Sequence, residues 1–438
     1  MIQTIKNAFK SKEVRNKILM TLLLVAIYRL GSFIPVPGLS ISADLKATLS
    51  SGFFGVMSAI TGGALENGTL FAIGISPYIN ASIIVQLLTV AIPPLERLSR
   101  QGDEGRKKLT KITRFATVIL ATIQAVGILF AYQNSGILNY YLFGTGNAAV
   151  PGWIVFIFVA LILVAGACLC MWIGERITEY GISNGMSLLI FVGILATAGQ
   201  KIIQVFSSIF QNGWTSGGWE LLGFILMTVI IFAFIVLVDK AERKITVQYA
   251  KQIKGNKMYG GQSTSIPIRV NGSGVLPLIF AFALTSFPEL LFNTFWAGQE
   301  WVAWYTLYLG TQSYVYPVML TLFIFLFAFF YQQVQFNPVE VSKNIQNNGG
   351  FIPGIRPGQP TAEYLTKVIQ RITFYGAFFL AIIAFVPTIL FRAIGAETIG
   401  LLNAFSATGM LIVVSVALEF DKALEQQLMM KYYKGFLK

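Results

Sequence analysis

The sequence GFFGVMSAITGGAL, residues 52–65, is apolar, carries no charge and contains four glycines. As a helix it would reach only about 21 Å, whereas the hydrocarbon core of a bilayer is about 30 Å thick. A full-length apolar run, residues 69–92, follows after only Glu66-Asn67-Gly68. We therefore expect residues 52–65 to form a half-helix that enters a membrane from outside and turns back. Backbone at that depth must be shielded from lipid by other helices. A loop lying on the outer leaflet is the alternative.

The whole chain has the composition of an integral membrane protein. Of its 438 residues 55% are hydrophobic and 12% are charged, whereas soluble domains carry about 25% charged residues. Ten apolar runs come close to the roughly 20 residues that a spanning helix requires. They are residues 18–34, 69–92, 115–132, 153–173, 182–198, 221–238, 275–296, 316–334, 372–390 and 399–418. We expect an all-α membrane protein with ten transmembrane helices.

Positive charge is confined almost entirely to alternate loops. With a cytoplasmic N-terminus, 28 of the 32 Lys and Arg residues fall on the cytoplasmic side, all but Arg29, Lys46, Lys201 and Arg392. This asymmetry sets the orientation and places both termini in the cytoplasm. The net charge of +13 is therefore a property of the loops. It predicts anionic lipid, nucleic acid or acidic protein surfaces as partners.

The ten spans divide into five and five around a long cytoplasmic loop. An odd number of spans in each half inverts the second half relative to the first, which is common around a central pathway. We divide the chain into a cytoplasmic N-terminal segment 1–17, a first half 18–210 that includes 52–65, a second half 211–418 that includes loops 239–271 and 337–371, and a cytoplasmic tail 419–438.

The two large cytoplasmic loops differ in pattern. In loop 239–271, residues 244–249 and 265–270 lie on either side of a Gly-Gly pair and predict a β-ribbon projecting into water. Loop 337–371 begins with a short polar helix closed by glycines and ends with the restart of a helix. Between the two helices, the sequence PGIRPG fixes an exposed turn that presents Arg356 at low entropic cost. The alternative is a cytoplasmic charge that merely falls in a turn.

The span 69–92 holds polar side chains at Asn80, Ser82 and Gln86. Such groups usually face the interior of a helix bundle, where they find hydrogen-bond partners. We expect Pro77 to kink this span. Ile75 and Ile79 share one helical face, and Ile190 and Ile194 repeat that spacing. By itself an isoleucine pair is typical of core or lipid-facing packing.

Missing residue types exclude several functions. The absence of histidine excludes a Ser-His-Asp triad and most zinc and haem sites, and no nucleotide-binding Gly-x-x-x-x-Gly-Lys-Ser/Thr loop is present. We expect no cofactor, metal or catalytic residue. Arg29 and Glu289 lie towards the outer ends of their spans, where the side chains can extend to the interface. A secondary transporter would need a coupling site that these spans do not offer. A membrane-embedded enzyme would need a catalytic cluster within the bilayer.

Several motifs together resemble those of the SecY/Sec61-alpha family of protein-conducting channels. They are residues 71–88, 179–187 (EYGISNGMS), 249–251 (YAK), 262–264 (QST), 275–280 (VLPLIF) and 351–358 (FIPGIRPG). The resemblance runs from end to end, includes both large loops and excepts the outer loop 136–152. It implies a clamshell of two inverted five-helix halves.

The resemblance also implies roles for particular residues. Residues 52–65 match the family's plug, which closes the pore from outside, with Gly52, Phe53, Phe54, Gly55, Met57, Gly62 and Gly63. The apolar pore ring falls on Ile75, Ile79, Ile190, Ile194, Ile279 and Ile412. A lateral gate separates the second and third spans from the seventh and eighth, and Gln86 matches a polar gate position. Docking of SecA or the ribosome falls on Arg243, Lys244, Lys251 and Arg356.

The function implied by this resemblance is passive. Unfolded secretory polypeptides cross the cytoplasmic membrane, and signal sequences or membrane segments leave sideways into lipid. The driving energy comes from a partner, so the chain itself is not an enzyme. The implied partners are the SecE and SecG subunits, the SecA ATPase, the ribosome, signal peptides and unfolded preproteins, anionic lipid, SecDF and YidC.

Overall fold

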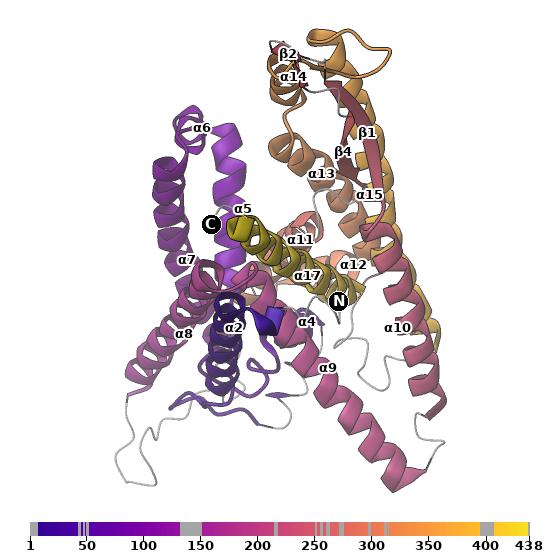
Figure 1. Cartoon of the computed structure of the whole chain (residues 1–438). Helices are drawn as coiled ribbons and strands as arrows, with labels where there is room; N and C mark the ends of the chain where they lie inside the picture. Colours follow the sequence, from indigo (N-terminus) through magenta and orange to yellow (C-terminus); the bar gives the residue numbers. More distant parts are fainter. Residues whose placement is uncertain are drawn as a thin grey trace.

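A computed structural model describes most of the chain in full-atom detail. The described residues are 8–42, 45–46, 49, 52–131, 151–213, 218–249, 252–254, 257–259, 263–270, 276–296, 299–310, 313, 315–394 and 407–436. Long helices dominate them, and a small β-sheet projects at one end beside α14 and α15 (Figure 1).

The first half of the chain contributes seven labelled helices. They are α2 (Lys12–Gly31), α4 (Gly52–Thr61), α5 (Ser76–Ala91), α6 (Pro93–Arg100), α7 (Asp103–Ala131), α8 (Gly152–Tyr180) and α9 (Gly185–Asn212). The pattern of α8 is representative: Val155, Val159 and Leu163 recur every four residues on a buried face, while Leu161 and Leu169 are exposed. Exposed leucines on long apolar helices fit a lipid surrounding.

The second half contributes seven further labelled helices. They are α10 (Gly218–Asp239), α11 (Leu276–Phe295), α12 (Glu300–Leu309), α13 (Val315–Gln335), α14 (Pro338–Asn347) and α15 (Gln359–Ile394), followed by α17 (Ala407–Phe436) at the C-terminal end. The two halves meet along two seams. At one seam α11 packs against α5 and α7, and at the other α17 packs against α9 and α2 as well as α10 and α15. Figure 1 shows α17 crossing between the groups α5–α8 and α13–α15.

In the described part of the chain, each of the ten apolar runs overlaps a helix. Within the described residues, six helices are long and apolar enough to cross a membrane, and seven if α5 and α6, bent by 106° at their junction, form one span. The count of ten spans therefore stays a prediction. The all-helical membrane architecture is confirmed.

The expected kink at Pro77 is wrong. Helix α5 begins at Ser76, so Pro77 occupies its first turn, where the missing N–H costs nothing and the fixed φ suits the helix. Before it, Leu70 N–H donates to the Ile34 carbonyl over 2.9 Å, and Val36 N–H donates to the Gly68 carbonyl over 3.0 Å. These bonds hold residues near Thr69 in extended contact with the segment after α2, so the helix cannot start there.

The predicted β-ribbon is confirmed and extended. Strand β1 (Glu242–Tyr249) pairs antiparallel with β4 (Ser263–Arg269), and a two-stranded ribbon of β2 (Gln252–Lys254) and β3 (Lys257–Tyr259) follows β1. Strand β5 (Gly350–Phe351) adds to the other edge of β1, giving the order β4-β1-β5. The two large loops thus share one sheet, which packs on α14 and α15 through a buried cluster that includes Ile245, Val247 and Leu365.

Candidate functional site

Five of the six isoleucines expected in the pore ring belong to or pack against one apolar cluster, and Ile75, just before α5, lies in the neighbouring cluster. Ile190 and Ile194 on α9, Ile279 on α11 and Ile412 on α17 belong to one buried cluster. Ile79 on α5 packs against it and also against the neighbouring cluster that contains Ile75. The arrangement is an apolar core shared by both halves.

Helix α4, the expected plug, packs against α9 and α11 next to this cluster. Its Phe54 and Met57 are buried in a second cluster, and Gly55 is also buried. Gly193 on α9 allows the backbones to touch, because a Cβ atom there would stand 2.0 Å from the Ile60 carbonyl oxygen. Gly52 and Phe53 lie in the first turn of α4, where the surroundings of their side chains fall outside the described residues. The segment is therefore a buried helix, not a loop on the outer leaflet.

The C-terminal end of α4 is held by polar side chains from other elements. Gly62 and Gly63 have φ of +75° and +82° and reverse the chain. Thr197 Oγ1 on α9 donates to the Ala59 carbonyl over 3.2 Å. Arg29 Nη1 on α2 donates to the Gly62 carbonyl over 3.5 Å. We call these two contacts the plug latch. Carbonyls at a helix C-terminus carry partial negative charge and so attract a cation.

The expectation that Arg29 and Glu289 extend to the membrane interface is wrong. Arg29 turns towards the plug latch, and its guanidinium lies 5.4 Å from the centre of the Phe33 ring. Glu289 on α11 is only 4% exposed. Both side chains find interactions inside the protein, which compensates for removing a charge from water.

Polar side chains lie on α5, α7 and α11, the helices whose contacts join the two halves at this seam. Gln86 is half-buried on α5. Thr285 Oγ1 on α11 lies 3.5 Å from the Tyr316 hydroxyl on α13. Gln124 on α7 is 1% exposed, and its Oε1 has no hydrogen-bond partner among the described residues. Sequence reasoning missed Gln124, although an amide inside the apolar run 115–132 was a usable signal. Seams with few satisfied polar groups are easier to separate than dry, interlocked cores.

A cavity of about 890 Å³ opens between the two halves. It lies between α5 and α6 of the first half and α13, α14 and α15 of the second. Amide and hydroxyl side chains dominate its wall, including Gln332, Gln333 and Gln370, with Phe329 and Phe336 among them. This mixed lining can accommodate an extended chain without holding one particular sequence. Sequence analysis did not identify it, because it is assembled from both halves.

The turn carrying Arg356 is fixed as predicted. Gly354 and Gly358 have φ of +82° and +96°, a region that favours glycine. Thr361 Oγ1 donates to the Arg356 carbonyl over 2.8 Å, and Ser342 Oγ donates to the Gly358 carbonyl over 2.7 Å. The Arg356 side chain itself is exposed. The backbone is thus rigid while the guanidinium is accessible.

The other expected docking residues lie elsewhere on the sheet. Arg243 and Lys244 are exposed near the start of β1, whereas β5 pairs with the far end of that strand at Gln248. Lys244 Nζ lies 3.4 Å from Glu242 Oε1, an exposed pair of small energetic value. Lys251 lies outside the described residues. The basic surface is therefore spread along β1 and not gathered around Arg356.

The motif at 179–187 builds the turn between α8 and α9. Asn184 Oδ1 caps α9 by accepting from Met186 N–H over 3.1 Å, and Thr178 Oγ1 accepts from Gly185 N–H over 2.9 Å. A Cβ atom on Gly185 would stand 2.0 Å from the Gly174 carbonyl oxygen. These contacts set the direction in which α9, which carries Ile190 and Ile194, begins after the turn.

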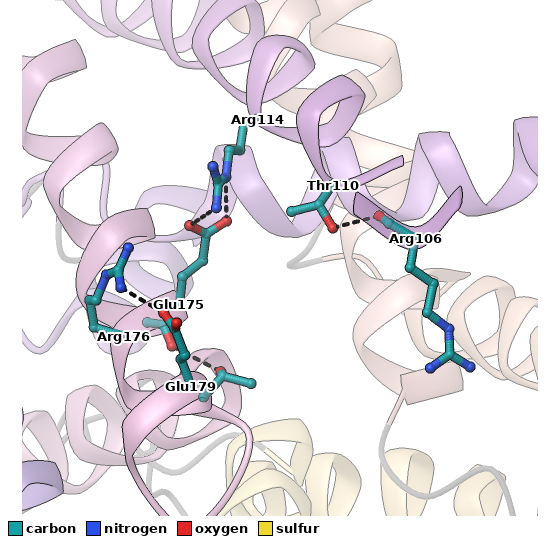
Figure 2. A network of polar contacts seen from close by, with 8 residues as sticks. Arg106, Thr110, Arg114, Glu175, Arg176 and Glu179 are labelled. Atoms are coloured by element: carbon teal, nitrogen blue, oxygen red, sulfur yellow. Dashed lines mark hydrogen bonds and ion pairs between the residues drawn. The ribbon is translucent and has the colours of Figure 1, made fainter. Parts of the chain in front are cut away.

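A charged network beside this turn ties α8 to α7 (Figure 2). The Arg114 guanidinium contacts both carboxylate oxygens of Glu175, with Nε 2.9 Å from Oε1 and Nη2 2.8 Å from Oε2. Arg176 Nη1 lies 2.6 Å from Glu179 Oε2. The Arg106 side chain points away from the network, and only its carbonyl takes part, accepting from Thr110. Two-contact arginine–carboxylate pairs fix geometry better than single ones. The Arg114–Glu175 pair in this network therefore fixes the position of α7 relative to α8 in the first half.

This arrangement is the architecture of protein-conducting channels. A solved structure titled "The structure of a protein conducting channel" matches with a TM-score of 0.66 at 20% identity, covering 94% of this chain and 92% of that one. Canine Sec61 in a ribosome–channel complex matches with a TM-score of 0.62 at 18% identity, covering 94% of this chain and 92% of that chain.

Sequence comparison is more specific. Residues 69–420 match the SecY family model. The protein translocase subunit SecY of Streptomyces scabiei is 42% identical over 449 residues, and that of Bacillus licheniformis is 38% identical over 447, each covering 100% of both chains. The chain belongs to the SecY family.

Proposed function

We propose that this chain is the pore-forming subunit of a protein translocase in the cytoplasmic membrane, with both termini in the cytoplasm. The observation that carries the proposal is the packing of α4 against α9 and α11, beside the buried isoleucines that α5, α9, α11 and α17 contribute. A short removable helix next to an uncharged constriction suits a pore that opens only for its substrate.

In this proposal the substrate is an unfolded polypeptide. It enters from the cytoplasm through the cavity between α5, α6 and α13–α15, passes Ile75, Ile79, Ile190, Ile194, Ile279 and Ile412, and displaces α4. Branched apolar side chains exclude water around the moving chain yet form no hydrogen bonds with it. The weak hydrogen bonds of the plug latch, each worth about 1 kcal/mol, suit a helix that must leave and return.

Apolar segments of the substrate take a different route. The seam between α5 and α7 on one side and α11 and α13 on the other serves as the lateral gate, with Gln86 beside it. A signal sequence or membrane segment that leaves there buries its apolar surface in lipid, at about 25 cal/mol per Å². Substrates that lack such a segment continue across.

The energy that drives the polypeptide through the channel comes from partners, and this chain does no catalysis. The exposed Arg356 turn, with Arg243, Lys244 and Lys251, is the docking surface for SecA or the ribosome. SecE and SecG complete the channel, anionic lipid meets the basic loops, and SecDF and YidC assist.

A reconstitution experiment tests this function. The chain is purified with SecE and SecG, placed in vesicles and supplied with SecA, ATP and a radiolabelled preprotein. Protease-protected preprotein should accumulate only when all components are present. Uptake of a small solute in place of the preprotein, driven by an ion gradient, would favour a secondary transporter.

A further inference from the structure

Helix α12 forms a small aromatic unit at the outer end of α11. The Phe292 ring of α11 lies 5.0 Å from each of the Trp301 and Tyr305 rings, centre to centre, and 6.3 Å from Trp296. Val302 on α12 is 4% exposed, and α12 also contacts α13. The helix is therefore docked firmly on the two spans that it connects.

A neighbouring face of α12 is exposed and largely apolar. Trp304 is 58% exposed, Leu307 70% and Tyr308 50%, and the Trp304 and Tyr308 rings lie 5.4 Å apart. Glu300 is the single charged residue in the twenty residues from Trp296 to Val315. A loop surrounded by water would expose charged and polar groups instead, so this face needs a covering.

Helix α12 contacts α13, which also exposes apolar side chains. Helix α13 is long and apolar enough to cross a membrane, and its first turns expose Val315, Val318 and Leu322. Because α12 ends at Leu309, its exposed side chains stand at the end of that apolar surface. Tryptophan and tyrosine concentrate at this level of a bilayer, where the ring is apolar and the N–H or O–H reaches water.

We propose that the exposed face of α12 is a membrane anchor that binds the headgroup region of the outer leaflet. The helix lies in the plane of the membrane with Trp304, Leu307 and Tyr308 at the boundary between headgroups and acyl chains, as interfacial helices do. Through Phe292 this anchor fixes the outer end of α11, which carries Ile279. That placement on the outer side rests on the proposed orientation.

The test measures where Trp304 sits. The full chain and its Trp304→Phe variant are reconstituted in phosphatidylcholine vesicles whose acyl chains carry bromine close to the headgroup or near the bilayer centre. Subtracting the emission spectrum of Trp304→Phe from that of the full chain gives the emission of Trp304 alone. The other tryptophans can therefore stay in place. A Phe351→Trp variant, with the new ring on the cytoplasmic sheet, is the matched control outside the membrane.

We expect the Trp304 emission to be blue-shifted and mostly lost with shallow bromine, and little changed with deep bromine or aqueous acrylamide. The emission of the new tryptophan in Phe351→Trp should instead be strongly reduced by aqueous acrylamide. Loss of Trp304 emission to acrylamide alone would overturn the proposal. Protection from bromine and acrylamide together would also overturn it, because a protein partner or second copy would then cover the face. The test needs no translocation, so its failure is distinct from that of the proposed function.

Discussion

The hydroxyl group of Thr197 on α9 donates a hydrogen bond to the carbonyl of Ala59 in α4, over 3.2 Å and across 138 residues of sequence. The same hydroxyl lies 3.2 Å from the Gly193 carbonyl of its own helix, to which it can also donate. Because both acceptors satisfy the hydroxyl, α4 can leave without stranding a buried donor. This contact explains how a buried helix can be held in place and still be released.

Weakening the plug latch should open the resting channel. Thr197→Val keeps the shape of the side chain and removes the donor, and Arg29→Met removes the cation beside Gly62. Each lost contact should cost about 1 kcal/mol and raise the unplugged fraction roughly five-fold. Ion conductance across planar bilayers without substrate measures this fraction. Thr122→Val, at an exposed position of α7 that bonds only within its own helix, is the control. Equal leak in Thr197→Val, Arg29→Met and the control would contradict the assignment.

The backbone contact at Gly193 gives a second test of plug packing. In Gly193→Ala the new methyl group would stand 2.0 Å from the Ile60 carbonyl, so α4 must shift away. Gly199→Ala changes the same helix where nothing lies within 4 Å, and it should be neutral or stabilising by up to about 1 kcal/mol. We expect raised resting conductance for Gly193→Ala only. A leak of similar size in both variants would show that helix propensity, not the contact, matters.

The isoleucine ring should act as a barrier to water. Ile279→Asn or Ile412→Asn places an amide in the constriction, and the variant channel should conduct ions at rest. Ile383→Asn, at a position 2% exposed in the same cluster on α15, serves as control for the roughly 1–3 kcal/mol cost of burying an amide. Unchanged conductance in Ile279→Asn and Ile412→Asn would count against the ring. Leak in all three variants would point to general loosening.

The rigid turn at Arg356 should be needed for coupling to the motor. Arg356→Glu reverses an exposed charge and leaves the backbone bonds from Thr361 and Ser342 in place. Translocation driven by SecA, and the stimulation of its ATPase by the channel, should fall close to background while the protein stays folded. Lys343→Glu makes the same charge change at an exposed position on α14 of the same loop and should retain both activities. Normal ATPase stimulation in Arg356→Glu would refute the docking role.

Features with a local cause could be predicted from the sequence. Hydrophobic length located the long apolar helices but missed the short helices α6 and α12, alternation located β1 and β4, and the glycine and proline frame located the Arg356 turn. The short apolar stretch 52–65 was correctly expected to be a buried helix, because it is too short to span and too apolar to lie in water.

Features that depend on distant partners could not be predicted. The start of α5 is set by hydrogen bonds to the segment after α2, which a single apolar run does not reveal. The inward turn of Arg29 depends on the position of Gly62, and the pairing of β5 with β1 joins loops that sequence analysis treated separately. The cavity between α5, α6 and α13–α15 needs residues from both halves. In each case a contact across the fold, not a local pattern, decides the outcome.

The central claim is that a translocating polypeptide passes the buried isoleucines. Photoreactive residues placed at 75, just before α5, and at 279 on α11 test it with a secretory chain stalled in the channel. The account predicts crosslinks from both positions to the stalled chain, and none from position 203, an exposed isoleucine on the outer part of α9. Crosslinks from position 203 together with none from 75 and 279 would show that the polypeptide takes another path.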